Sequence, residues 1–423
     1  MSLPSGRAER ASGLPERYID PSGAGARDPL EGLRRLEPAI TGGPRRRRRW
    51  RWRRLLVVPV ALIVFSAWSV VGAVTTPGNQ SFSAKWADWM RGHHAAFVVN
   101  HFEAFYYSHN APAKGGRPKA LNPVPQPGQP TVSSPATAPR HLAPPGPVPL
   151  VVSPALPGEG QWQPVGPSRG GVHGMYEAQF RADTVYTSEI TSAVWIDPTL
   201  MKVALMPGLT EPGGTWAHPP YVTSAERPAL AAAFNGGFRF QDAGGGIFLD
   251  GRVAVRLRTG AASLVIYSSG RVDIGTWGTD VTMTPNVVAV LQNLLPMVDH
   301  GQVSAAATYN DSRIWGSTLG AATVVARSGV GVTSDGALVY VAGPALTART
   351  LAESLQRAGA VRAMTLDINP EWVTFNFYSH PDPADPGALT PSKLYPQMQR
   401  PADRYLGPTE EARDFFTVSL PPS

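Results

Sequence analysis

Hydrophobic and polar residues divide this sequence into segments with different periods. Residues 1–54 have no sustained hydrophobic period and are rich in Gly, Pro, Arg and Glu, which is typical of a disordered tail. Residues 55–74 form an uncharged apolar run of about 20 residues, the length that a helix needs to cross a bilayer. Aromatic and apolar positions in 75–110 recur at roughly helical spacing, which predicts a juxtamembrane amphipathic helix.

The C-terminal segment, residues 158–423, has the pattern of a strand-rich globular domain. Paired alternating runs with turn residues between them predict three β-hairpins, at 247–253, 264–274 and 331–341. Helical periods are fewer and predict helices at 284–295 and 350–358. This mixture predicts an α+β fold with mixed or antiparallel strands and a few helices.

One polar turn near the end of this domain, in residues 359–378, lies between two apolar runs. The pattern predicts a strand, a tight turn and a second strand, with Asp367 where the first strand ends. Asn369 and Glu371 lie in the turn. These side chains at the rim of a sheet are candidate site residues, although a polar hairpin loop would also account for them.

Residues 111–157 are rich in proline and predict a linker between the membrane segment and the globular domain. Pro-rich segments favour extended polyproline II structure and act as semi-rigid spacers. About fifty residues at ~3.1 Å each would hold the domain as far as ~150 Å from the membrane.

The net charge of +7 does not indicate a nucleic-acid-binding protein, because the excess is confined to the N-terminal tail. Residues 1–54 hold fourteen Arg and six acidic residues, and the rest of the chain is nearly balanced. Eight of those Arg lie in 45–54, directly before the apolar run. By the positive-inside rule, this places the N-terminus in the cytoplasm and the C-terminal domain outside the cell membrane, after a single pass.

A cleaved signal peptide is the alternative reading of the apolar run. The run exceeds the 7–15 residues that are typical of a signal peptide, and a long tail precedes its basic region. These features favour an uncleaved anchor, whose partner is the lipid bilayer. The aromatic residues of 75–110 then predict either an interfacial helix or a helix that packs on itself or on a partner.

Metal and cofactor chemistry have few candidates in this sequence. Cysteine is absent, which excludes disulfides and thiolate ligands. His94 and His101 share a helical face but have no acidic ligand beside them, so we predict no metal site there. No cofactor is predicted, although Asp242, Glu371 and Asp367 could converge on a divalent cation such as calcium.

Two further segments carry candidate site residues. Asn235, Gly236 and Gly237 are followed shortly by Asp242, and paired glycines let a ligand approach the backbone. An ordinary tight turn explains the same residues. Arg327 lies among small and β-branched residues in a predicted buried strand, where it needs either an anionic ligand or a structural salt bridge.

Taken together, these segments resemble the phosphodiester glycosidase family. The resemblance rests on AFNGGF at 233–238, SLVIYSSGRVDIG at 263–275, ARSGVGVTSDGALVYV at 326–341 and AGAVRAMTLD at 358–367. It covers most of 158–378 and none of the anchor or linker. The sequence INPEW at 368–372 stands where the family typically has a glycine-rich run, so Pro370 removes a donor and Trp372 adds bulk.

The resemblance implies hydrolysis of a sugar-1-phosphodiester. Arg327 would hold the phosphodiester, because a planar guanidinium matches two phosphate oxygens. Asp367 would activate water or stabilise positive charge at the anomeric carbon, with Glu371 as the second choice. The residues left for substrate binding are Asn235, Gly236, Gly237, Asn369 and Asp242, and His173 and His300 are reserve acid–base candidates.

The function expected from these observations is that of a membrane-anchored extracytoplasmic hydrolase. Its substrate would be a phosphodiester-linked glycan of the envelope or of an exopolysaccharide. A catalytically inactive relative that binds a glycan or a partner protein in the envelope is the alternative from another class. A structural envelope protein, with the linker as its main feature, is the third.

Overall fold

The computed structural model describes residues 45–109, 111–125, 140–316 and 323–421. The predicted tail up to residue 44 lies outside the described residues. The chain divides into two compact units, Met1–Ala61 and Leu62–Ser423, and the second unit contains all the β-sheets described below.

Helix α1 (Arg45–Thr75) contains the predicted membrane span. Its Val57–Thr75 part is long and apolar enough to cross a membrane, with a mean hydropathy of 2.3, a property that it shares with signal sequences. The predicted juxtamembrane helix is two helices, α2 (Phe82–Gly92) and α3 (Ala96–His109). The Ser81 hydroxyl caps α2 by accepting a hydrogen bond from the Ala84 amide at 3.2 Å.

The largest sheet has eight strands, and all its neighbouring pairs are antiparallel. In order across the sheet, these strands are β1 (Gln163–Pro164), β4 (Met175–Phe180), β5 (Thr191–Ile196), β16 (Leu338–Leu346), β15 (Val325–Thr333), β17 (Ala360–Thr365), β13 (Pro296–Asp299) and β14 (Gln302–Val303).

Two five-stranded sheets complete the domain. One has the order β19 (Thr390–Lys393), β18 (Phe375–Ser379), β7 (Leu230–Asn235), β20 (Phe415–Ser419) and β6 (Lys202–Met206). The other has the order β11 (Val272–Thr276), β10 (Ala262–Tyr267), β12 (Val287–Gln292), β8 (Ile247–Leu249) and β9 (Arg252–Val255). The remaining short elements are β2 (Ser168–Arg169), β3 (Val172–His173), η1 (Arg227–Ala229), α4 (Phe240–Ala243), α5 (Ala305–Thr308) and α6 (Ser312–Trp315). The α+β class is therefore confirmed.

The main core lies between these sheets. Alternate residues of β15, including Ala326, Val330 and Val332, belong to a cluster that also contains Phe234 of β7 and Phe375 of β18. The rings of Phe234 and Phe375 stack with centroids 5.6 Å apart. A strand directs successive side chains to opposite faces, so the residues between these positions on β15 face away from this core.

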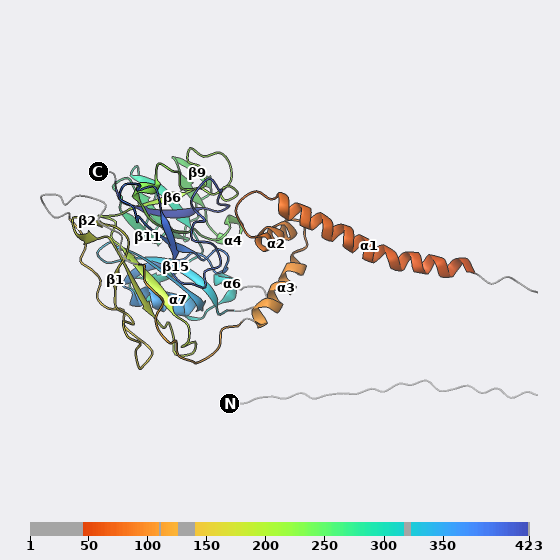
Figure 1. The fold of residues 1–423 in the computed structure, drawn as a ribbon, viewed down its shortest axis with the longest axis horizontal. Coiled ribbons are helices and arrows are strands. Elements are labelled where there is room, and N and C mark those ends of the chain that lie inside the picture. The colour runs from red at the N-terminus through yellow and green to blue at the C-terminus, as the bar shows by residue number, and fades with distance from the viewer. Residues whose placement is uncertain (1–44, 110, 126–139, 317–322, 422–423) are drawn as a thin grey trace, which may run out of the picture. The chain divides into compact units, whose positions relative to one another are not determined.

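Helix α7 (Ala348–Arg357) covers that second face of the eight-stranded sheet (Figure 1). A Cβ on Gly329 of β15 would lie 3.0 Å from Leu355 of α7, so this glycine lets the helix approach the sheet closely. The helix agrees with the prediction for 350–358. Its capping box is formed by Thr347 and Thr350, and Gly359 follows it with a φ of 100°.

All three predicted hairpins are present, as β8–β9, β10–β11 and β15–β16. The helix predicted at 284–295 is wrong, because this segment contains β12, which pairs with β10 and β8. Short apolar runs do not distinguish a strand from a helix by period alone, and β-branched valines favour the strand.

The two strands in 359–378 do not form a hairpin with each other. The first, β17, belongs to the eight-stranded sheet, whereas the second, β18, pairs with β7 and β19 in another sheet. The polar turn between them therefore carries the chain from one sheet to the next, and Asp367 lies at the beginning of this crossing.

The Pro-rich segment is not a free spacer in its described parts. The Asn122 amide donates to the Gln179 side chain at 2.8 Å, and the Leu142 amide donates to the Asp197 carboxylate at 2.8 Å. Val148 is buried in the hydrophobic cluster beneath α7. Residues 111–125 and 140–157 therefore lie against the globular domain. The composition had predicted a spacer that holds the domain away from the membrane, and these contacts correct that prediction.

Candidate active site

Asp367 is fixed by hydrogen bonds directly after β17. Its Oδ1 accepts from the amides of Ile368 and Asn369, both at 2.8 Å, and its Oδ2 accepts from Nη1 of Arg413 at 3.0 Å. The side chain is buried. Burial raises the pKa of Asp367, and the charge of Arg413 opposes this shift. The carboxyl group thus has one defined position beside one guanidinium.

Asn235 ends β7 in the neighbouring sheet and connects the two sheets. Its Oδ1 accepts from the Tyr340 hydroxyl at 3.0 Å and from the Thr374 amide at 3.2 Å. Its Nδ2 lies 3.2 Å from the Ser328 hydroxyl, which also accepts a hydrogen bond from the Asp367 amide. The structure therefore brings Asn235 and Asp367 together through Ser328, and the Asn235 side chain holds the site's framework.

Gly236 and Gly237 follow β7, and two polar side chains lie close against their backbone. A Cβ on Gly236 would lie only 1.9 Å from Oδ2 of Asp414. A Cβ on Gly237 would lie 3.3 Å from Cγ of Asn293. The paired glycines predicted as substrate-binding residues thus make room for the side chains of Asp414 and Asn293.

Asp414 is a buried carboxyl group whose two oxygens have no hydrogen-bond partner among the described residues. Burial and the nearby charge of Glu211 together raise the pKa of Asp414 to about 8, and the charge of Arg413 opposes this shift. Oδ1 of Asn293 is likewise buried without a partner in the described part of the chain, while its Nδ2 donates to the carbonyls of Thr365 and Leu366. Leaving such groups unpaired costs about 1–3 kcal/mol each, so they need a specific explanation.

Arg327 lies on the other face of β15 from Ser328. Its guanidinium donates to the carbonyls of Leu346, Trp315 and Thr323 at 2.9–3.2 Å. The side chain is almost fully buried, and burial lowers the pKa of Arg327 to about 10. Within the described residues, no hydrogen bond or ion pair joins Arg327 to Asp367 or Asn235, because adjacent residues of a strand point to opposite faces.

Arg413 is the guanidinium that contacts the candidate carboxylate. Besides its hydrogen bond to Asp367, it stacks over the ring of Trp372 with its Cζ 4.0 Å from the centroid. Its Nε and Nη2 have no hydrogen-bond partner within the described ranges. This geometry leaves donors for an anionic ligand beside Asp367.

Comparison with known proteins supports the resemblance found in the sequence. Residues 229–367 match the family model for phosphodiester glycosidases, a range that contains Asn235, both glycines and Asp367. This part of the chain is related to the phosphodiester glycosidase family. No curated protein matches the sequence.

The solved structures that are similar to this chain have low sequence identity to it. One is the catalytic domain of zebrafish N-acetylglucosamine-1-phosphodiester alpha-N-acetylglucosaminidase, auto-inhibited by its pro-peptide. It is 17% identical, with a TM-score of 0.37, over 60% of this chain and 85% of the other. A hypothetical protein from Synechocystis is 12% identical, with a TM-score of 0.29, over 60% and 65%. A putative exported protein from Burkholderia pseudomallei K96243 is 12% identical, with a TM-score of 0.29, over 55% and 74%.

Glu371, the second predicted carboxylate, has its oxygens occupied. It accepts hydrogen bonds from the amide and the hydroxyl of Ser81, both at 3.0 Å, and from Nη1 of Arg400 at 2.8 Å. The Glu371 side chain is buried in this arrangement. In this geometry Glu371 attaches the start of α2 to the domain.

The other two predicted binding residues lie near the same turn or on α4. Asn369 accepts a hydrogen bond from the Glu371 amide at 3.0 Å and so stabilises the turn. Asp242 is on α4, 3.6 Å from Nε of Arg239, with an exposed side chain. Among the described residues, Asp242 forms no hydrogen bond or ion pair with Asp367.

A pocket of about 300 Å³ lies between α2 and this turn. Ser83, Ala84, Ala87, Asp88 and Arg91 line it from α2, and Asn369, Pro370, Glu371, Trp372, Gln399 and Arg413 line it from the domain. Three predicted or observed site residues, Asn369, Glu371 and Arg413, therefore open onto one pocket. Helix α2 supplies the wall opposite to them.

Metal binding finds no support in the part of the chain that the structure describes. The carboxylates of Asp242, Glu371 and Asp367 have separate cationic partners. No group of three His, Asp or Glu side chains in the described ranges is placed to hold a metal ion, and this includes His94 and His101.

The reserve histidines are not close partners of Asp367. His300 follows β13 with a largely exposed side chain, 3.8 Å from Asp299. His173 is on β3, and burial lowers its pKa. Neither histidine forms a hydrogen bond or ion pair with Asp367, Arg413 or Asn235 in the described part of the chain.

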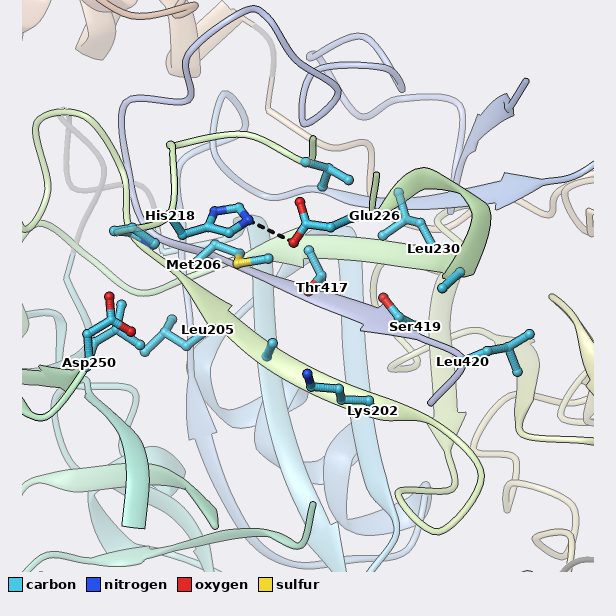
Figure 2. A pocket seen from close by; sticks show the side chains of 15 residues that line it. Lys202, Leu205, Met206, His218, Glu226, Leu230, Asp250, Thr417, Ser419 and Leu420 are labelled. Carbon is cyan, nitrogen blue, oxygen red and sulfur yellow. Dashed lines mark hydrogen bonds and ion pairs between the residues drawn. The ribbon is translucent and has the colours of Figure 1, made fainter. Parts of the chain in front are cut away.

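A second pocket, of about 390 Å³, lies on the outer face of β6 and β20 (Figure 2). Lys202 of β6, Thr417 and Ser419 of β20, and the hydrogen-bonded pair His218–Glu226 line it. None of the predicted site residues is among its lining residues.

Sequence reasoning missed Arg413, Asp414 and Asn293. Arg413 and Asp414 lie outside the segments that carry the family resemblance. They directly precede the run at 415–418, which belongs to strand β20. Asn293 lies within the segment 284–295 that was predicted as a helix, and it directly follows β12. The run FFTV at 415–418 is the signal that could have found Arg413 and Asp414, because polar residues directly before a buried strand lie at the rim of its sheet.

Proposed function

We propose that this chain is a membrane-anchored extracytoplasmic hydrolase that cleaves sugar-1-phosphodiester bonds in envelope or exopolysaccharide glycans. The observation that supports this most is the buried contact between Asp367 and Arg413, whose neighbour Asp414 lies against the Gly236 backbone. A glycosyl phosphodiester needs a cation for its phosphate and a carboxylate near its anomeric carbon. The matched range, 229–367, ends at that carboxylate.

In the proposed reaction, Asp367 orients a water molecule at the anomeric carbon or stabilises the positive charge that develops there. The C1–O bond to phosphate breaks, water supplies the new hydroxyl of the sugar, and its proton leaves with the phosphomonoester. Phosphate is a good leaving group, so a strong general acid is less necessary than in ordinary glycosidases. Arg413 holds the phosphate oxygens, a role that the sequence had given to Arg327, and Asn235 keeps the two sheets in register.

The proposed localisation rests on α1 and the charge before it. Val57–Thr75 is an apolar helix of sufficient length, and eight Arg precede it in 45–54. Together they favour a single-pass protein with its N-terminus in the cytoplasm. A signal sequence is the competing reading of the same helix.

The second candidate function is that of an inactive relative that binds a glycan. The observation that favours it is the hydrogen bonding of Glu371 to Ser81 and Arg400, which occupies both oxygens of one predicted carboxylate. Asn369, Pro370 and Trp372 then line a pocket that binds a sugar without cleaving it.

Substitution of Asp367 tests the enzymatic proposal. Release of free sugar from soluble sugar-1-phosphodiesters is measured for the full chain and for Asp367→Asn. We expect a loss of at least about 100-fold in kcat, the usual contribution of a positioned acid or base. Asp382→Asn, a change of the same kind in an exposed loop, is the matched control and keeps full activity. Equal activity of wild type and Asp367→Asn would refute the assignment, and inactive wild type on all diesters would favour the binding function.

A further inference from the structure

Helix α2 packs on the C-terminal part of α1 through aromatic contacts. The Trp89 ring lies 4.7 Å from the Trp68 ring and 6.1 Å from the Phe65 ring, measured between centroids. Nε1 of Trp86 donates to the Ser69 hydroxyl at 3.1 Å. Phe65, Trp68 and Ser69 belong to the apolar part of α1, so α2 lies alongside the candidate membrane span.

The same segment is attached to the candidate active site on its other side. Ser81 bonds to both oxygens of Glu371, and Asp88 of α2 pairs with Arg239 at 3.0 Å. Just before α2, the Asn79 side chain donates to the carbonyl of Arg404 at 2.9 Å. Helix α2 thus contacts the span with one face and the site with another.

The order of these segments along the chain determines how far the site lies from the span. Helix α2 precedes the Pro-rich segment 111–157, so that segment cannot separate α2 from α1. From Phe65 to Thr75 the helix rises only ~15 Å at about 1.5 Å per residue. Where α2 packs on α1, it therefore lies within ~15 Å of the C-terminal end of this apolar part.

Helix α3 adds exposed aromatic side chains beside this position. Phe97 and Phe102 are 74% and 65% exposed, and Phe82 at the start of α2 is 53% exposed. We name these three residues the aromatic patch. Amphipathic helices with exposed Phe and Trp lie in the membrane interface with their apolar side chains between the lipids. A bilayer surface continuous with α1 accounts for the exposure of the aromatic patch.

We infer that the substrate is a lipid-linked sugar-1-phosphodiester, a polyprenyl phosphate monosaccharide, which enters the pocket from the bilayer surface. This inference rests on the proposed function. In this class the sugar is joined through one phosphate to an isoprenoid alcohol. Water attacks C1, the C1–O bond breaks, and free sugar and polyprenyl phosphate are formed. Arg413 contacts the phosphate, and the isoprenoid chain stays in the lipid between α1 and the aromatic patch.

The experiment uses the full chain in phosphatidylethanolamine–phosphatidylglycerol vesicles. One arm contains a polyprenyl phosphate monosaccharide in the vesicles, and the other contains the water-soluble methyl phosphodiester of the same sugar. Sugar release is measured in both arms, and a diazirine on the isoprenoid chain reports binding by crosslinking. Because the lipid arm raises the local concentration at the pocket, we expect kcat/KM at least about tenfold above the soluble arm.

Trp89→Ala tests the link between α1 and the pocket, because it removes the contacts with Phe65 and Trp68. We expect the preference for the lipid arm to disappear in this variant while the soluble arm changes little. Trp216→Ala, a tryptophan that stacks on Arg252, is the control and keeps the preference. Circular dichroism and retention in vesicles verify that both variants are folded and inserted.

The outcomes separate the two proposals. Cleavage of the soluble diester with neither cleavage nor crosslinking of the lipid overturns this inference and leaves the proposed function standing. Crosslinking near α2 without cleavage in either arm supports the ligand class and overturns the hydrolase. Absence of crosslinking and of cleavage in both arms overturns both proposals.

Discussion

Arg413 and Asp367 form a hydrogen-bonded ion pair of 3.0 Å, although 46 residues separate them in the sequence. Asp367 ends the segment that matches phosphodiester glycosidases, and Arg413 directly precedes Asp414 and the last strand, β20. The pair therefore joins the matched region to a C-terminal segment outside it. Removing one partner would leave the other charge buried and unpaired.

Replacement of Arg413 by Lys should test what the planar guanidinium contributes. Lys keeps the positive charge near Asp367 but loses the stacking on Trp372 and the forked donors. We expect sugar release from a sugar-1-phosphodiester to fall at least about tenfold through a higher KM, since each charge-assisted hydrogen bond contributes about 1.5–3 kcal/mol. Arg313→Lys, an exposed arginine on α6, serves as the control. Unchanged KM in Arg413→Lys would exclude a phosphate-binding role.

Replacement of Asp414 by Asn should stabilise the protein in a pH-dependent manner. The pKa of Asp414 is raised to about 8 in the folded protein, above its value of about 3.9 in the unfolded chain. The unfolded state therefore releases this proton first, so wild type loses stability as pH rises from about 4 to about 8. Asn cannot ionise, and the stability advantage of Asp414→Asn should grow over that window and then level off.

Urea unfolding at several pH values measures this advantage. Glu177→Gln is the matched control, because burial also raises the pKa of Glu177 to about 8, but its Oε1 accepts from Gln179. The stability advantage of Glu177→Gln over wild type should also grow with pH, and its rate of sugar release should equal that of wild type. A lower stability of Asp414→Asn than of wild type at pH 8 would contradict the absence of a hydrogen-bond partner for Asp414.

Replacement of Gly236 by Ala should destabilise the fold. The new Cβ would lie 1.9 Å from Oδ2 and 2.6 Å from the carbonyl oxygen of Asp414, and the backbone atom cannot move aside. We expect a loss of about 1–3 kcal/mol or more in the free energy of unfolding, as for other overpacked sites. Gly237→Ala is the comparison, because its contact with Cγ of Asn293 is 3.3 Å and involves a side chain that can shift. Equal stabilities of the two variants would show that this close approach is not maintained in solution.

Local sequence patterns correctly predicted the elements that are determined by residues close together in the sequence, such as tight turns and an amphipathic helix. Asp335–Gly336 predicted the β15–β16 turn, and the apolar spacing in 350–358 predicted α7. The helix predicted at 284–295 was wrong because the short apolar run at 287–292 does not distinguish a mostly buried strand from a helix by its composition. The turn after Asp367 was read as a hairpin, since nothing local indicates that its two flanking strands join different sheets.

The site could be predicted only for residues inside recognisable segments. Asp367 was found because it ends a strand within a familiar motif, and the partner of Asp367 was missed because long-range pairing leaves no local pattern. Glu371 lay in the correct turn, but its contact with Ser81 spans 290 residues. The catalytic role of Asp367 remains a prediction that Asp367→Asn tests, and the roles of Glu371 and Arg327 remain predictions.

Strand β20 lies between β7 and β6, so the sheet that contains Asn235 is continuous only when this late segment is in place. A ribosome makes β20 after every other strand described, and Arg413 and Asp414 immediately before it. During synthesis, the edges of β6 and β7 must therefore wait unpaired until the end of the domain emerges. If α1 enters the bilayer first, the site can assemble only after translocation of this domain is complete, on the far side of the membrane.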